Sequence, residues 1–548
     1  RNPHGSNQLA ISLPKLGQLE QLMTGGTGLC RPADARFDAW FRTIADRWVV
    51  PCERGAAVYL TQSVQSWDDP VSLLAGRSAL LRVFVTAPQG SGAAMPDVRA
   101  TFYLDGAERH TVHIPASTQT IPTYVTEDDL ALSANAEIPG EVIAPGLEMV
   151  IEVDPDGTLD PALGVTKRVP DSGRMQVDVR TLPPFQLTLI PFLTEGDPDS
   201  AAVDTVASMA ADPNGGHEWL RDVRTILPVG ELVVLAHDPV TTSYRHVVRR
   251  LGQVEAMRLM EGGTGHWMGM FAQPESRTTF PSIANLGGRE TMVSVSAGRD
   301  APRIVAHELG HNLGLGHAPC GTNVSGLDPW FPHRGGRIGA WGYDPERRAL
   351  LDPKAYDLMS YCWGNHWISD YFYNKAFDHR AAEVATEAAT MADPGRSLLV
   401  WGGLDEDGAP YLDPAFVVDA APSLPSAGGE HMIVGATSDG SPLFSFTFDL
   451  PIIDDAEGEE TSFVFALPVQ ANWTDLASVT LSGPAGSATL DESTDRPMAI
   501  LTDPGTGQVR AFLSNPRSAT RAAAGQTPAQ GLEVLFSRGI PSAGAWRP

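Results

Sequence analysis

Two histidines and a glutamate stand close together in the segment HELGH, residues 307–311. On an α-helix, His307 and His311 share one face because they are four residues apart, so both imidazoles can reach one metal ion. Glu308 lies about 100° round the helix from His307, close enough to act on a water molecule at that ion. This arrangement predicts metal-assisted chemistry with Glu308 as the general base.

The flanking residues predict where this helix begins and ends. Asp300 can cap its N-terminus, and Pro302 suits its first turn. Gly314 tolerates the left-handed conformation that ends a helix sharply, and the turn brings His317 round as a third imidazole. Three neutral nitrogens with one open position predict a catalytic zinc site. In the alternative interpretation the histidines only satisfy local hydrogen bonds; three of them with a glutamate at these spacings argue against it.

The longer segment HELGHNLGLGH, residues 307–317, resembles the zinc-binding signature of the metzincin endopeptidases. The second half of that signature is a tight turn whose methionine lies beneath the zinc imidazoles. The segment YDLMSYCW places Met359 forty-two residues after His317 and resembles this turn. A methionine is otherwise often plain core filler. The resemblance implies a metzincin catalytic domain with one zinc ion on His307, His311 and His317.

Tyr361 follows Met359 by two residues, a spacing that is similar to the astacin and serralysin branches of the metzincins. Carried over, Tyr361 would be a fifth zinc ligand at rest and a hydrogen-bond donor to the oxyanion in the transition state. The alternative interpretation is a tyrosine buried beside the turn.

A further element, WGYD at residues 341–344, resembles a Trp-Gly-Trp-Asp element of the secreted enterobacterial mucinases that cut O-glycosylated glycoproteins. The GHN and GLGH parts of the zinc motif are also similar to those enzymes and to gametolysin-like enzymes. The resemblance covers about residues 180–380, and the Ala-Pro-Cys-Gly at residues 318–321 departs from the mucinase pattern. It implies a secreted bacterial zinc endopeptidase that acts on extracellular glycoproteins.

The chain has four cysteines, and their positions predict two disulfides, Cys30–Cys52 and Cys320–Cys362. An even, small number is typical of an oxidising compartment. The second disulfide would tie the zinc segment to the methionine turn. Four reduced thiols, or one cysteine in the zinc site, are the alternatives. Cys30 in GLCRPAD also resembles the latency cysteine that caps zinc in some zymogens, although a disulfide to Cys52 is the simpler interpretation.

A chain of 548 residues is too long for one hydrophobic core, and the pattern of its apolar residues changes along its length between helix-type and strand-type spacing. The predicted fold class is multidomain α+β, with a metzincin-type catalytic domain, a mixed sheet with a zinc-site helix, flanked by β-sandwich domains. The predicted divisions are an N-terminal segment with a short helix at Phe37–Val50 (1–53), a β-sandwich (54–182), the catalytic domain (183–398) and a second β-sandwich (399–548).

The formal net charge of -27 opposes binding to nucleic acid and to anionic membranes. No apolar run is long enough for a transmembrane helix. Aspartate-rich turns at residues 154–157 and 405–408 are candidates for Ca²⁺, but ordinary turns are the simpler interpretation. The acidic stretch at residues 454–460 is predicted to be a solvated loop.

Two function classes follow from these observations. The first is a secreted zinc-dependent endopeptidase with a protein or glycoprotein substrate. The second is a glycan- or protein-binding surface protein with an incidental metal domain. Glu308 argues against the second class, because a protein that only binds has no use for a general base.

Overall fold

The computed structural model describes residues 56–273, 282–320, 326–390, 395–425, 427–456, 460–526 and 531–546. The predicted helix at Phe37–Val50 and the predicted Cys30–Cys52 disulfide lie outside these residues. The described residues form two compact units. The first ends at Thr181 and takes in Gly339–Pro353, and the second holds Leu182–Ile338 and the described residues from Lys354 onward.

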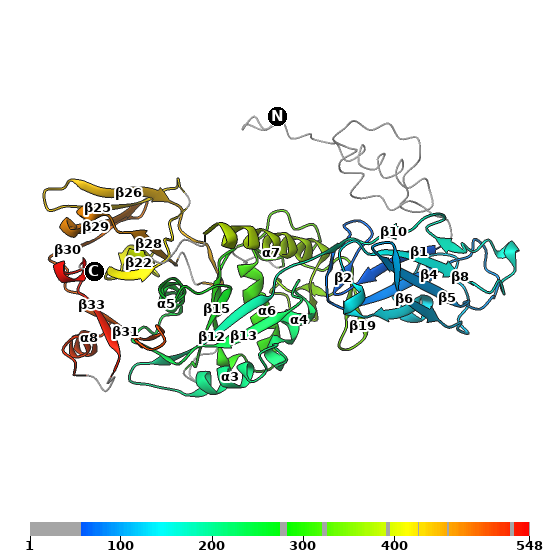
Figure 1. Ribbon diagram of the computed structural model, residues 1–548, viewed down its shortest axis with the longest axis horizontal. Helices are drawn as coiled ribbons and strands as arrows, with labels where there is room; N and C mark the ends of the chain where they lie inside the picture. The colour runs from blue at the N-terminus through cyan, green and yellow to red at the C-terminus, as the bar shows by residue number, and fades with distance from the viewer. Residues whose placement is uncertain are drawn as a thin grey trace, which may run out of the picture. The chain divides into compact units, whose positions relative to one another are not determined.

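Most strand residues of the first unit lie in two antiparallel sheets (Figure 1). Apolar side chains from both sheets, including Leu81, Phe102 and Ile151, are buried in one shared core, as expected for strands with one solvated face. One sheet contains β1 (Ala56–Thr61), β4 (Ala79–Val85) and β7 (Ala134–Ile138), and the other contains β5 (Val98–Leu104), β6 (Ala107–Ile114), β8 (Glu148–Val153), β9 (Arg168–Val169) and β10 (Met175–Gln176).

The WGYD element belongs to a small sheet of this first unit. β18 (Trp341–Asp344) pairs with β19 (Ala349–Leu351) and with β2 (Val64–Gln65), so residues almost 280 positions apart form one ladder. β3 (Leu73–Leu74) runs parallel to β11 (Val179–Arg180) in the same unit. The hairpin that follows the zinc motif in sequence therefore packs with the N-terminal strands.

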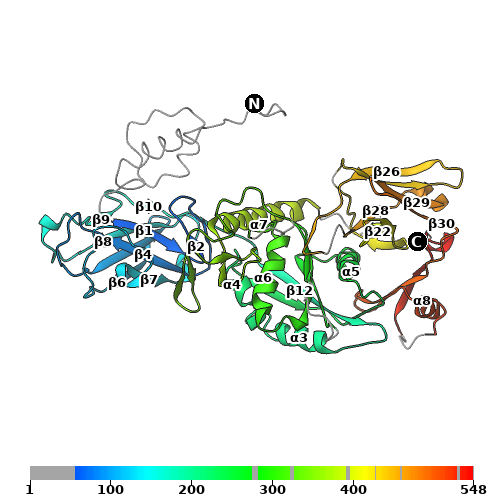
Figure 2. The ribbon, with the colours of Figure 1, turned by 180° about the vertical axis from the view of Figure 1, so that it is seen from behind.

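Ten described strands of the second unit form one mixed sheet (Figure 2). β12 carries the apolar run FQLTLIPFL and runs parallel to β13, β14 and β15, as expected for a strand covered on both faces. β16 runs antiparallel to β17 near one edge. The strands are β12 (Phe185–Thr194), β13 (Leu232–Ala236), β14 (Val240–Thr242), β15 (His266–Phe271), β16 (Ile283–Asn285), β17 (Glu290–Ser294), β27 (Ile453–Asp454), β31 (Met498–Thr502), β32 (Val509–Leu513) and β33 (Glu533–Ser537).

Helices pack against this sheet and position the zinc motif. The helix α5 packs on β15 and β17 and ends just before Gly262, whose φ is +63°. The helix with the HELGH segment, α6, packs on β16 and β17. The described α-helices are α3 (Ala201–Ala210), α4 (Arg221–Thr225), α5 (Val247–Met260), α6 (Ala301–Asn312), α7 (Asp370–Thr390) and α8 (Pro516–Ala523). None of these combines the length and apolar composition needed to span a bilayer.

The segment after residue 395 contributes sheets of its own and strands to the mixed sheet. Its own two sheets enclose an aromatic core in which Phe448, Phe463 and Phe465 contact one another. Between β26 and β28 the chain leaves these sheets to add β27 to the mixed sheet. The two sheets contain β22 (Gly395–Leu404), β23 (Pro410–Leu412), β24 (Phe416–Ala420) and β28 (Thr461–Pro468), and β25 (His431–Ala436), β26 (Pro442–Phe448), β29 (Ser478–Gly483) and β30 (Gly486–Asp491).

The mixed α+β class predicted from the sequence is confirmed, with sheets predominating. The apolar segments FQLTLIPFL, GHWMGMFA and ETMVSVSA supply β12, β15 and β17. The metzincin-type topology and the β-sandwich assignments stay predictions.

Candidate active site

The helix α6 presents the HELGH segment from its last two turns. Pro302 lies in the first turn as predicted, but the Asp300 side chain makes no capping hydrogen bond because its backbone is already helical. Gly314 has a φ of +77°, and the amide of Leu315 donates to the carbonyl oxygen of Gly310 at 3.0 Å. The positive φ of Gly314 and this hydrogen bond end the helix as predicted, and the chain turns back toward His317.

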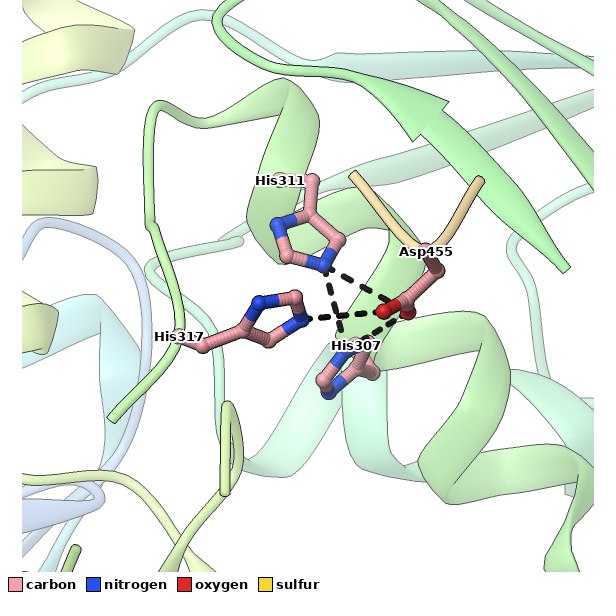
Figure 3. Close-up of side chains that lie close together, drawn as sticks. All are labelled: His307, His311, His317 and Asp455. Atoms are coloured by element: carbon pink, nitrogen blue, oxygen red, sulfur yellow. Dashed lines mark hydrogen bonds and ion pairs between the residues drawn. The ribbon is translucent and has the colours of Figure 1, made fainter. Parts of the chain in front are cut away.

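The three histidines of the motif converge in a buried cluster (Figure 3). The Nε2 atoms of His307 and His311 lie 3.1 Å apart. The ring centre of His317 lies 4.7 Å from that of His311 and 5.5 Å from that of His307. The structure therefore brings together the three imidazoles that the sequence singled out.

The outer ring nitrogens of two of these histidines are held by backbone carbonyl groups. His307 Nδ1 lies 2.9 Å from the carbonyl oxygen of Leu358, and His311 Nδ1 lies 2.8 Å from that of Leu315. A nitrogen that donates to a carbonyl keeps its proton, so a metal ion that displaces the proton of the other nitrogen would find the lone pair of each ring aimed at the cluster. This arrangement orients both Nε2 atoms for metal binding.

A fourth group, the carboxylate of Asp455, enters the cluster from the end of β27. Its oxygens lie 3.2 Å from His307 Nε2 and 3.0 Å from His317 Nε2, with His311 Nε2 at 3.7 Å. In Figure 3 it comes from a pale orange segment, whereas the histidines come from green ones. Ligand atoms bound tetrahedrally at about 2.0 Å are separated by about 3.3 Å, so these four groups fit one metal ion.

The solvated loop predicted for residues 454–460 is wrong for the part of it that the structure describes. The side chain of Asp454 is 3% exposed and that of Asp455 is 12% exposed. The Asp454 carboxylate lies 3.2 Å from His311 Nδ1. Asp455 follows His307 by 148 residues, and the two-residue strand β27 has no periodicity that would reveal its partner. The available signal was the pair of aspartates directly after the apolar Ile452–Ile453.

Glu308 is buried beside this cluster, and its Oε2 accepts no hydrogen bond from the described residues. Burial raises the pKa of this carboxyl well above its usual range, and the charges of Asp455 and Asp454 raise it further. A carboxylate with raised proton affinity and an unused oxygen is suited to accept a proton from a reacting group.

The electrostatics of the four clustered groups favour a bound cation. Burial lowers the pKa of His307 to about 4, so this imidazole is neutral and able to bind a metal. Burial also lowers the pKa of His311, but hydrogen bonds to Asp454 and Asp455 outweigh it and raise the pKa to about 10. Burial raises the pKa of Asp455, yet hydrogen bonds from the three histidines hold it far below its usual range. The Asp455 carboxylate therefore stays ionised. Its negative charge stabilises a positive charge in the cluster, either a proton on His311 or a metal ion.

The predicted methionine turn packs directly beneath the helix. Met359 is fully buried, and its Sδ lies 2.7 Å from the place where a Cβ on Gly310 would be. Tyr361 is 47% exposed, with its ring centre 4.7 Å from that of His317. It is therefore not buried beside the turn, as the alternative interpretation had it, but stands at the mouth of the cluster.

The disulfide between Cys320 and Cys362 is present, as predicted. It joins the chain just after His317 to the chain just after Tyr361. Because the two sulfurs bond to each other, neither cysteine takes part in the metal site.

Residues 278–371 match the family model of Peptidase M66. The matched segment contains the three histidines, Glu308 and the methionine turn, and it supports a metallopeptidase activity. A search of the curated proteins found no match to the chain.

Two residues that the sequence analysis did not select hold this site in place. Asn312 is buried at the end of α6, and its amide donates to the carbonyl oxygens of Asn285 and Glu290, each at 3.0 Å. These bonds fix α6 against β16 and β17. Asp357 accepts from the amides of Met359 and Ser369, each at 2.8 Å, and so shapes the methionine turn. Burial raises its pKa to about 6.

The two aspartate-rich turns proposed as calcium candidates use their carboxylates within the chain. Asp154 accepts from the amides of Thr158 and Leu159 and pairs with Lys167. Asp405 accepts from the amides of Asp407 and Ala409. These are the bonds of ordinary aspartate turns.

Proposed function

We propose that this chain is a zinc-dependent endopeptidase of the metzincin type, with His307, His311 and His317 as zinc ligands and Glu308 as general base. The convergence of three buried Nε2 atoms beside an unpaired carboxylate oxygen is the observation that carries the proposal. Imidazole and carboxylate groups at tetrahedral spacing suit zinc. The match to Peptidase M66 gives independent support for a peptidase.

A zinc ion held by these residues would act as a Lewis acid on a peptide carbonyl and would lower the pKa of a water molecule from about 15.7 toward about 7. The residues of the chain supply the remaining steps. Glu308 accepts the proton of the attacking water and delivers it to the nitrogen of the leaving amine as the C–N bond breaks. Its burial keeps bulk water from competing for this proton.

Tyr361 is placed to stabilise the oxyanion of the tetrahedral intermediate. Its ring lies beside His317 and is partly exposed, so its hydroxyl can turn toward a substrate carbonyl. A donor aimed at the developing oxyanion often contributes a factor of about 100 to 1,000 in rate. The role of a fifth zinc ligand at rest, implied by the resemblance to astacins, belongs to the same proposal.

The proposed substrates are extracellular proteins, with glycoproteins as the class implied by the mucinase resemblance. The Cys320–Cys362 disulfide supports an oxidising compartment, and hence secretion. The buried general base and the peptidase match count against the second function class, a surface-binding protein.

Replacement of Glu308 by Gln tests the catalytic proposal. The variant keeps the shape of the side chain but cannot accept the proton, so zinc binding should persist while casein cleavage falls by roughly 100- to 10,000-fold. Bound zinc is measured by elemental analysis, and parent activity should disappear with a chelator and return with zinc. The comparison is made with Asp455 intact and in an Asp455→Ala background, because this carboxylate occupies a ligand position. Cleavage by Glu308→Gln at the parent rate in both backgrounds would refute the role.

A further inference from the structure

Four groups, three imidazoles and the Asp455 carboxylate, surround the proposed zinc position. A catalytic zinc site keeps one position open for water or substrate, whereas a four-ligand site is closed. Asp455 stands at 3.0 to 3.7 Å from all three Nε2 atoms, so its carboxylate takes the position that a hydrolytic reaction needs. The four groups together are therefore a full ligand set for one ion.

A second, independent observation concerns the backbone that leads to Asp455. β27 pairs antiparallel with β16, with Ala284 opposite Asp454 and Asn285 opposite Ile453. The amide of Leu286 also donates to the carbonyl oxygen of Ile452 at 2.9 Å. Addition of an extended segment to a sheet edge is a common mode of peptide binding. The chain thus covers, with its own backbone, the edge strand that lies next to the zinc position.

The turn at Asp455 is held in an uncommon conformation. Its φ is +67°, in the left-handed region, which costs a non-glycine residue about 1 kcal/mol or more. The surrounding contacts must offset this cost: the Asp454 carboxylate at His311 Nδ1 and the Asp455 carboxylate at the three Nε2 atoms. The preceding and following strands, β26 and β28, belong to the C-terminal sheets, so the turn is anchored on both sides.

From these observations we propose that Ile452–Asp455 is a built-in inhibitor of the peptidase. Asp455 is the fourth zinc ligand of the latent enzyme, and β27 pairs with β16 in the way that a bound peptide would. Activation requires the Asp455 carboxylate to leave the metal and the segment to leave the edge, after which a peptide substrate takes both places. This inference rests on the proposed zinc peptidase function and adds its regulation.

The test replaces Asp455 by Ala and, with almost unchanged shape, by Asn. Asp449→Ala is the matched control, because Asp449 is an exposed aspartate between β26 and β27 and is not part of the metal cluster. Without the Asp455 carboxylate at the metal, the site should be open to substrate. The kcat/KM for casein-derived peptides should therefore rise by roughly tenfold or more in both Asp455 variants. Loss of a ligand should weaken zinc affinity, measured by chelator competition, by roughly tenfold or more. The control should match the parent in both measurements.

A cobalt-substituted protein gives a reading that does not depend on turnover. Acetohydroxamate should change the visible spectrum of the Co²⁺-loaded Asp455→Ala variant at concentrations that leave the Co²⁺-loaded parent unchanged, because only the variant has an open position. Equal spectral responses, or unchanged zinc affinity, would show that Asp455 is not a ligand and overturn the inference. Loss of activity in both Asp455 variants of a well-folded protein would make Asp455 a required ligand and also overturn it, with the peptidase proposal intact. Failure of parent and variants alike to bind zinc would instead refute the proposed function.

Discussion

The contact between Gly310 and Met359 gives a sharp prediction, because it joins the zinc helix to the methionine turn. A Cβ added at Gly310 would lie 2.7 Å from Met359 Sδ, about 1 Å inside normal contact distance. Replacing Gly by Ala inside a helix normally stabilises it by about 1 kcal/mol. Overpacking of a filled core costs about 1 to 3 kcal/mol, so Gly310→Ala should be destabilising by about 1 kcal/mol overall.

The prediction is tested by combining Gly310→Ala with Met359→Ala. Met359→Ala alone should cost about 2 to 5 kcal/mol, since this side chain is fully buried. In the Met359→Ala background the methyl group added at residue 310 has room, so Gly310→Ala should become stabilising by about 1 kcal/mol. The coupling between the two sites is then about 2 kcal/mol.

The assay is thermal unfolding in a Glu308→Gln background, which prevents self-digestion. Each kcal/mol corresponds to about 1.4 °C in a unit of this size. Gly252→Ala in α5 is the matched control, because the nearest atoms to its added Cβ are those of Ser462 at 3.5 Å, an ordinary contact. Zinc affinity of Gly310→Ala should also fall, because the displaced turn carries the Leu358 carbonyl that holds His307. If Gly310→Ala proved as harmless as Gly252→Ala while Met359 is present, the packing of the turn beneath α6 would be refuted.

Two further predictions concern the turn itself. Burial raises the pKa of Asp357 to about 6 from 3.8, so the folded chain keeps this proton up to about pH 6 and the unfolded chain only to about pH 4. Its contribution to stability is therefore complete below about pH 4 and is lost as pH rises through 6; denaturation curves of the parent should weaken by about 3 kcal/mol more over this range than those of Asp357→Asn. The second prediction concerns the disulfide: the Cys320→Ser/Cys362→Ser variant removes a covalent link between residues 42 positions apart in the chain. It should lose about 4 kcal/mol by chain entropy, seen as a melting midpoint several degrees lower, and an unchanged midpoint would contradict the constraint assigned to that bond.

The sequence alone predicted the local parts of the site. The helix around His307 and His311, its end at Gly314 and the return to His317 follow from helical periodicity and from glycine's tolerance of positive φ, which act within a few residues. The Cys320–Cys362 disulfide was also within reach, because its two cysteines flank motifs already assigned to one place. The metzincin assignment and the roles of Glu308 and Tyr361 stay predictions.

Only the tertiary structure decided which distant segments meet these residues. Asp455 reaches the histidines through a two-residue strand whose pairing with β16 leaves no pattern in the sequence. The WGYD element pairs with β2 of the first unit, although it lies between the zinc motif and the methionine turn in the chain. Strand pairing depends on which surfaces are buried together across the whole fold, whereas helix ends and turns depend on neighbouring residues. The sequence therefore determined the three imidazoles, and tertiary structure decided that the Asp455 carboxylate stands among them.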